Sequence, residues 1–149
     1  MALVNVREMM QKAEREHYAV GHFNINNLEW TKCILQVAEE TRTPVILGVS
    51  EGAVKYMCGF KVVATMVKSM VESLNITVPV ALHLDHGDSF ELCKACIDGG
   101  FTSVMIDGSH LSYEDNVALT KKVCEYAHDV EARGRYVTVE GELGRLAGI

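Results

Sequence analysis

Short apolar runs alternate along the chain with longer segments in which apolar residues recur every three or four positions. The run over residues 45–50 has no polar alternation, which is typical of a strand buried on both faces of a parallel sheet. The longer segments have the spacing of amphipathic helices. The pattern predicts helices over residues 4–16, 28–42, 60–74, 89–98 and 112–133, and strands over 18–24, 45–50, 78–87, 101–107 and 136–142.

Polar residues mark several of the expected helix ends. Asn5 is a candidate cap of the first helix, and residues 112–115 resemble a capping box. We expect the strand over 18–24 to be short and buried. In the helix over 28–42 we expect one apolar stripe on the inner face, formed by Trp30, Cys33, Ile34, Val37 and Ala38.

The regular order of strands and helices predicts an α/β fold with a parallel sheet and right-handed crossovers. Two architectures fit: an open doubly wound sheet, or part of a (β/α)8 barrel. No Gly-x-Gly-x-x-Gly follows the first strand, which disfavours a dinucleotide-binding domain. Both architectures place their functional sites at the carboxyl ends of the strands.

Polar side chains gather at those strand ends. In VPVALHLDHGDS, residues 78–89, a buried strand turns polar at its tip, and His83 and Asp85 share one face by period-2 geometry. The strand-end candidates for a common site are Asn24, Ser50, Asp85, His86, Asp107 and Glu142.

One histidine and several carboxylates suit a divalent cation better than a hydrolytic triad. Ser50 lies in Gly-Val-Ser-Glu-Gly, which fits the letters of a nucleophile elbow, but no base is evident beside it. No strand carries a lysine for a Schiff base. Cys93 and Cys96 have the CxxC spacing, and we expect them to fill the inner face of a helix rather than act in redox or zinc chemistry.

The remaining histidines have structural interpretations. We expect His83 to orient Asp85 or to fill a polar inner layer, and His22 to lie in the core or the barrel interior. His110 is expected in a solvated loop. His17 and His128 are expected on helix surfaces or ends.

Composition limits the function classes. The 149 residues carry a net charge of −6 with no lysine or arginine cluster, which disfavours a nucleic-acid surface. No apolar run approaches the roughly 18 residues of a membrane span, and the N-terminus lacks a signal-peptide core. We expect a soluble, cytoplasmic protein with reduced cysteines. A phosphorylated substrate remains open, because backbone N–H groups can bind phosphate.

Five segments, in this order, resemble the N-terminal part of class II, zinc-dependent fructose-1,6-bisphosphate aldolases and the related tagatose-bisphosphate aldolases. The segments are AVGHFNINN, PVILGVSEGA, VPVALHLDHGDSFE, GFTSVMIDGSH and VEGELGRLAGI. The resemblance covers essentially the whole chain. It implies a (β/α)8 barrel that reversibly cleaves a ketose bisphosphate to dihydroxyacetone phosphate and glyceraldehyde 3-phosphate.

The resemblance also implies roles for particular residues. Asp85 matches the acid/base that exchanges a proton with the C4 hydroxyl, and His86 matches a ligand of the catalytic zinc. Asp107 and Glu142 match the carboxylates of a second, looser divalent-metal position. Zinc would polarise the substrate ketone as a Lewis acid in place of a lysine imine.

Asn24 and Ser50 match positions that contact the substrate, with Ser50 at the phosphate of the glyceraldehyde phosphate half. The resemblance leaves open whether the sugar is fructose or tagatose bisphosphate, and whether a monovalent cation is needed.

Length departs from the family. A full barrel takes about 250 residues, and the zinc of the family needs two further histidines from later strands. We therefore expect residues 1–149 to be the N-terminal part of a single aldolase barrel domain, with little or no turnover alone. Its open sheet edges favour homo-oligomerisation. The alternative from another class is a non-catalytic half-barrel that acts as a scaffold subunit.

Overall fold

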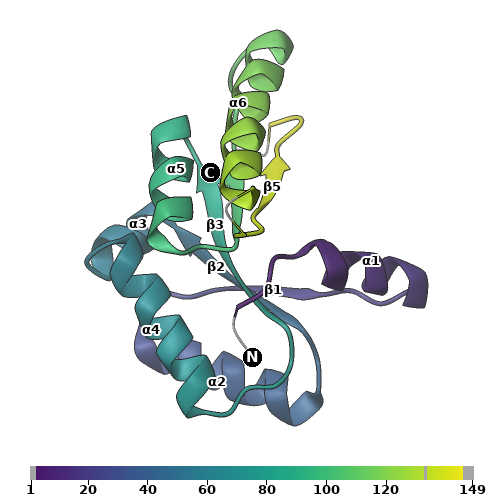
Figure 1. Cartoon of the computed structure of the whole chain (residues 1–149), viewed down its shortest axis with the longest axis vertical. Helices are drawn as coiled ribbons and strands as arrows, with labels where there is room; N and C mark the ends of the chain where they lie inside the picture. Colours follow the sequence, from purple (N-terminus) through teal and green to yellow (C-terminus); the bar gives the residue numbers. More distant parts are fainter. Residues whose placement is uncertain (1–2, 133, 146–149) are drawn as a thin grey trace.

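The chain forms a parallel sheet flanked by helices (Figure 1). The computed structural model describes residues 3–132 and 134–145. The strands are β1 (Gly21–Asn24), β2 (Val45–Ser50), β3 (Val80–Gly87), β4 (Ser103–Ile106) and β5 (Thr138–Gly141). The helices are α1 (Arg7–Glu16), α2 (Leu28–Thr41), α3 (Glu51–Tyr56), α4 (Phe60–Ser73), α5 (Phe90–Gly99) and α6 (Tyr113–Glu131).

The strands lie side by side in the order of the chain, β1-β2-β3-β4-β5, and every pair is parallel. A doubly wound sheet reverses its strand order at a switch point, and no reversal occurs among these five strands. The sequential order is that of a (β/α)8 barrel. The predicted fold class is confirmed, and the sequential order decides between the two architectures that the sequence had left open.

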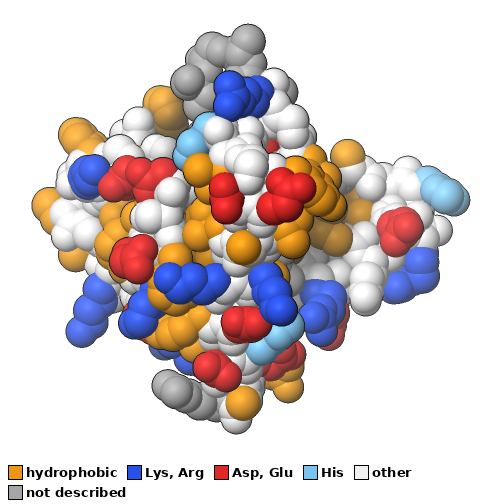
Figure 2. Space-filling model, turned by 90° about the horizontal axis from the view of Figure 1, so that it is seen from above, with side chains coloured by type: hydrophobic (Ala, Val, Ile, Leu, Met, Phe, Trp, Pro, Cys, Tyr) orange, Lys and Arg blue, Asp and Glu red, His pale blue; other side chains and the backbone are white. Residues whose placement is uncertain are grey.

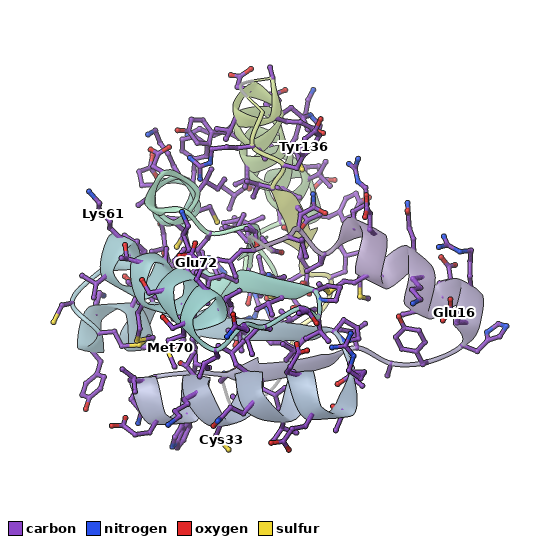
Figure 3. The ribbon with its side chains drawn as sticks, turned by 60° about the horizontal axis from the view of Figure 1, so that its bottom comes forward. Glu16, Cys33, Lys61, Met70, Glu72 and Tyr136 are labelled. Atoms are coloured by element: carbon purple, nitrogen blue, oxygen red, sulfur yellow. The ribbon has the colours of Figure 1, made fainter. Side chains whose placement is uncertain are left out.

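The core lies between the outer face of the sheet and the crossover helices. Outward-facing strand residues such as Leu47 and Leu82 are fully buried against α2, α4, α5 and α6. These helices cover the sheet, whereas α1 stands apart from them in Figures 1 and 3. The segment before α1 is tied to the sheet, because Val4 N donates to Val80 O at 2.9 Å.

Helix ends follow the local sequence signals in most places. The side chains of Asn27, Ser50, Ser89 and Ser112 accept hydrogen bonds from the first turns of α2, α3, α5 and α6. The expectation for Asn5 was wrong in detail. Val6 occupies the cap position of α1. Asn5 lies one residue before it, and its side chain accepts from the N–H of Arg7, the first residue of the helix.

The expected apolar stripe of α2 was wrong in most of its members. Thr31, Leu35 and Ala38 are the buried residues of this helix, whereas Trp30 and Val37 are 55% and 50% exposed. Cys33 points away from the sheet (Figure 3), and Ile34 is only half-buried. The buried face is therefore rotated from the expected one, and it holds Thr31, whose hydroxyl donates to Asn27 O at 2.7 Å. A polar residue hydrogen-bonded within its own helix gives no apolar signal in the sequence.

Strand β1 was expected to be buried and is mostly exposed. It pairs only with β2 and forms one edge of the described sheet, so its side chains lack a neighbour on the other side. His22 belongs to this strand and is exposed on the inner face, not in a core. Strands β4 and β5 are also shorter than the apolar runs that predicted them.

The inner face of the sheet carries polar residues. His83 in β3 is 2% exposed, and its Nδ1 lies 2.7 Å from Ser103 Oγ in β4. Burial, together with the neighbouring His22, lowers the pKa of His83 to about 4. The polar inner layer expected of His83 is therefore present, and the ring is neutral at pH 7.

Truncating a side chain to alanine should cost more stability on the outer face of β2 than on its inner face. Leu47→Ala empties a site packed by helices and should lower the free energy of unfolding by about 2–5 kcal/mol. Its chain neighbour Ile46, half-buried on the inner face, is the matched control. Ile46→Ala should cost about 1 kcal/mol. Urea unfolding of both variants measures the difference, and equal losses would contradict this assignment of the faces.

The buried neutral His83 predicts a pH-dependent stability. As pH falls below about 6.5, the unfolded chain binds a proton at His83, whereas the folded chain does so only near pH 4. Stability is thus fully present above pH 6.5 and falls by about 3 kcal/mol as pH approaches 4. His83→Gln should flatten this part of the profile in urea titrations at pH 7 and 4.5, whereas the exposed control His128→Gln should not. A profile unchanged by His83→Gln would refute the assignment.

Candidate functional site

The carboxyl end of β3 is distorted where the predicted site begins. The register with β4 shifts between Leu84 and Gly87, and His86 has a left-handed φ of 49°. In a regular strand Asp85 and His86 would point to opposite faces of the sheet. Here Asp85 lies within reach of Asn24 in β1, and His86 turns toward Asp107 after β4. Gly87 is required at this step, because a Cβ would lie 2.8 Å from Met105 O.

His86, Asp107 and Glu142 come together at three neighbouring strand ends. Each offers a ligand atom, and these atoms all lie within 4.8 Å of one another. His86 Nδ1 is 2.8 Å from Asp107 Oδ2, and Ser109 N donates to Asp107 Oδ1 at 3.0 Å. The parallel register thus brings together residues that are far apart in the chain, as the sequence predicted.

The segment that carries Glu142 is fixed by a residue that sequence reasoning missed. Asn116 in α6 is 6% exposed, and its Nδ2 donates to Glu142 O at 2.7 Å. A Cβ at Gly108 would lie 2.4 Å from Asn116 Oδ1, so this glycine leaves room for the amide. A polar residue on a predicted inner helix face, near a polar strand end, is the signal that could have identified it.

His86 and Asp107 stabilise each other's charged forms. The hydrogen bond with Asp107 raises the pKa of His86 above its usual value, against the opposing effect of burial. Burial favours the neutral acid of Asp107, but hydrogen bonds from Ser109 and His86 outweigh it and lower the pKa of this carboxyl. A proton on His86 Nδ1 therefore competes with a cation for this nitrogen.

The donor set fits a divalent metal ion. It combines an imidazole nitrogen with two carboxylates, which suits Zn²⁺ and other first-row dications. The side chains of His86 and Asp107 are 28% and 20% exposed, so an ion can reach them from solvent.

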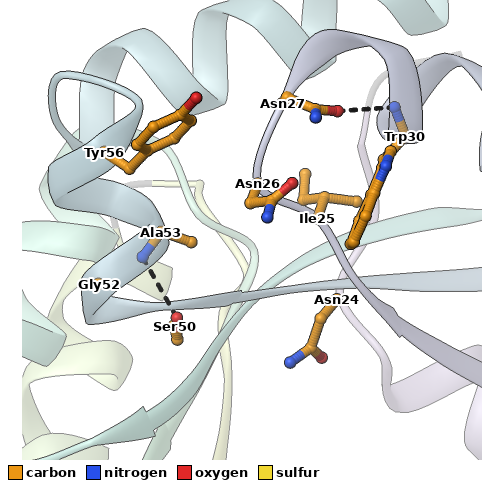
Figure 4. Close-up of a pocket in the computed structure, with 9 residues that line it drawn as sticks. All are labelled: Asn24, Ile25, Asn26, Asn27, Trp30, Ser50, Gly52, Ala53 and Tyr56. Carbon is orange, nitrogen blue, oxygen red and sulfur yellow. Dashed lines mark hydrogen bonds between the residues drawn. The ribbon is translucent and has the colours of Figure 1, made fainter.

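Asp85 lies beside this cluster and is oriented by a neighbour. Asn24 Nδ2 donates to Asp85 Oδ2 at 3.2 Å, and Ser50 is the register partner of Asp85 in β2. Asn24 and Ser50 also line a cavity of about 380 Å³ between the ends of β1 and β2. In Figure 4, Trp30 and Tyr56 stand at opposite sides of this cavity.

Ser50 is not arranged as a nucleophile. Its Oγ accepts a hydrogen bond from Ala53 N at 3.2 Å and caps α3. None of the described residues that line the cavity is a histidine. Cys93 and Cys96 are buried on the inner face of α5, as predicted. Burial raises the pKa of the Cys93 thiol to about 12, which keeps it protonated.

His17, His110 and His128 are not members of the His86 cluster. His17 ends α1 in a left-handed conformation, His128 is exposed on α6, and His110 is exposed in the loop after β4. Among the described residues no helix is long and apolar enough to cross a membrane. Acidic and basic side chains are interspersed over the face shown in Figure 2, with hydrophobic side chains visible between them.

Comparison with known proteins identifies the family of the chain. Residues 4–149 match the family described as fructose-bisphosphate aldolase class-II. A fructose-bisphosphate aldolase of Geobacillus stearothermophilus is 64% identical over 148 residues, which cover 99% of this chain and 50% of that protein. A fructose-bisphosphate aldolase of Staphylococcus aureus strain Mu50 is 57% identical with the same coverage.

A solved structure gives the same answer for the fold. The X-ray structure of the YdjI aldolase from Escherichia coli K12 superposes with a TM-score of 0.85 at 33% identity, covering 99% of this chain and 53% of that chain. The chain thus spans about half the length of the curated relatives it matches. Because the family match extends over nearly all of the chain, the chain belongs to the class II fructose-bisphosphate aldolase family.

Proposed function

We propose that the protein to which this chain belongs is a zinc-dependent aldolase. It reversibly cleaves fructose 1,6-bisphosphate to dihydroxyacetone phosphate and glyceraldehyde 3-phosphate. The observation that carries the proposal is the placement of Asp85 next to the His86–Asp107–Glu142 cluster, in a chain of this family. A general base and a cation site side by side are what aldol cleavage without a lysine imine requires.

In this proposal Asp85 removes the proton from the C4 hydroxyl during cleavage and returns it during condensation. Its hydrogen bond from Asn24 holds the carboxylate in one orientation. His86 would be a ligand of the catalytic zinc, and Asp107 and Glu142 would hold a second divalent ion or an alternative position of the first. Bound zinc would supply Lewis-acid polarisation of the ketone oxygen.

The cavity lined by Asn24 and Ser50 is the proposed binding region for the glyceraldehyde phosphate half. Among the described residues, those that line it include amides and a hydroxyl but neither lysine nor arginine. A phosphate there would therefore be held by hydrogen bonds rather than by a side-chain cation. This agrees with the acidic net charge of −6.

We further propose that residues 1–149 supply the first five strands of one barrel domain in a cytoplasmic homo-oligomer. Sequential parallel order with β1 and β5 at the edges of the described sheet supports the barrel. Exposed edges attract further strands or subunits. In this arrangement the remaining zinc ligands come from strands beyond those described.

The enzymatic proposal predicts metal-dependent cleavage by the protein isolated from its source. A coupled triose-phosphate assay should show turnover of fructose bisphosphate that EDTA abolishes and zinc restores. Asp85→Asn should lower kcat by about 10²- to 10⁴-fold, with the zinc at the His86 cluster retained. Tagatose bisphosphate is the control substrate. Zinc-bound protein without turnover on either sugar would refute the proposal in favour of a scaffold subunit.

The His86–Asp107 ion pair predicts how pH governs metal binding. Because Asp107 raises the pKa of His86, a proton competes with zinc as pH falls. Asp107→Asn should lower the pKa of His86 in the metal-free chain, as followed by NMR titration of the imidazole signals. The imidazole signals of His128, which is exposed on α6, serve as the internal control. An unchanged His86 titration would show that the pair does not form.

A further inference from the structure

We propose that the chain carries a further metal site, separate from the His86–Asp107–Glu142 cluster. It is formed by His22, His83 and Asp85 and takes a first-row transition-metal dication such as Zn²⁺. The ligand atoms of these three residues all lie within 4.8 Å of one another. None of the three belongs to the His86 cluster. The site lies on the inner face of the sheet, where β1 and β3 flank β2.

The first supporting observation is an unsatisfied buried nitrogen. His83 is 2% exposed, its Nδ1 is paired with Ser103 Oγ, and its Nε2 is buried without a hydrogen-bond partner. A Glu140 carboxylate oxygen is 3.6 Å from Nε2, too far for a hydrogen bond. An unpaired buried polar atom destabilises a fold, and a coordinated ion would satisfy it. A metal-binding histidine usually has a hydrogen bond at its other ring nitrogen, and Ser103 Oγ provides one here.

The second observation is the space made for His22. The His22 and His83 rings are nearly perpendicular, at 87°, with centroids 5.2 Å apart. Gly48 lies between them in the sheet as the register partner of His83. A Cβ at Gly48 would come within 2.0 Å of His22 Nε2. The absence of a side chain at this position therefore allows the His22 ring to lie over β2 toward His83.

Charge and geometry match a dication. Asp85 contributes a carboxylate, and Glu140 lies near enough to His83 to add a second. His83 is neutral at pH 7, because burial lowers its pKa to about 4, and a metal ligand must be deprotonated. Donors on a tetrahedral zinc lie about 3.4 Å apart, given bonds of about 2.1 Å. The ligand atoms here lie within 4.8 Å of one another, and rotation of the exposed His22 side chain can shorten its distances to the other two.

The two clusters diverge from adjacent residues of β3. Asp85 reaches toward β1, and His86 turns toward Asp107, so two ions would not share a ligand. An ion held by His22, His83 and Asp85 would occupy the carboxylate proposed as the acid/base. The site would then inhibit cleavage when filled. This consequence, unlike the site itself, rests on the proposed function.

Isothermal titration calorimetry of the metal-free chain with Zn²⁺ tests the site. The wild-type chain should bind two equivalents. His22→Gln should remove one equivalent because it deletes a ligand. Gly48→Ala should remove the same equivalent because the added Cβ displaces the His22 ring. Asp107→Asn should remove the other equivalent, and His128→Gln should remove none. In NMR spectra, the imidazole signals of His22 and His83 should shift upon addition of zinc.

His22→Gln and Gly48→Ala change positions outside the proposed catalytic residues, and circular dichroism verifies that each variant is folded. Retention of two equivalents with affinity within about tenfold in both variants would overturn the proposal. A single wild-type equivalent that His22→Gln leaves intact would also overturn it. The wild-type chain could also bind a single equivalent that His22→Gln removes and Asp107→Asn does not. That result would contradict the proposed aldolase metal site and support the site at His22, His83 and Asp85.

Discussion

The pairing of His86 with Asp107 is the contact on which the candidate site depends. It joins the ends of two neighbouring parallel strands, and it forms only because β3 leaves its regular register before Gly87. A left-handed backbone at His86 is unfavourable for a residue with a side chain. The carboxylate of Asp107 and the close packing under Gly87 hold it there. The distortion lets two consecutive residues, Asp85 and His86, serve two separate groups of side chains.

The two faces of the sheet contribute differently to stability and to function. The outer face buries aliphatic residues under α2, α4, α5 and α6, which supplies the stability of the described part of the chain. The inner face holds the exposed His22 and the buried His83 and Ser103. The polar atoms of the two buried residues cost stability unless each finds a partner. His83 Nε2 has none within the described residues. The ion proposed above would supply this partner.

Much of this was predictable from the sequence, and the failures have physical reasons. Continuous apolar runs such as that of β2 fixed strand positions, because burial on both faces leaves little choice of residue. The strand-end location of Asp107 and Glu142 followed from parallel topology. The buried face of α2 was not predictable, because Thr31 satisfies its hydroxyl within the helix and Trp30 stays exposed. The side chains of Asp85 and His86 reach different partners because the register of β3 shifts between Leu84 and Gly87, and the sequence pattern of the strand does not show this shift. Asn116 acts through its contact with Glu142, which depends on tertiary structure.

The central claim is that His86, Asp107 and Glu142 bind one cation at the ends of three parallel strands. Anomalous X-ray diffraction at the zinc absorption edge, on crystals of the zinc-loaded protein, tests it most directly. The account predicts an anomalous peak within about 2.5 Å of the imidazole of His86 and of at least one of the two carboxylates. Zinc-loaded crystals with no peak near His86 would contradict it.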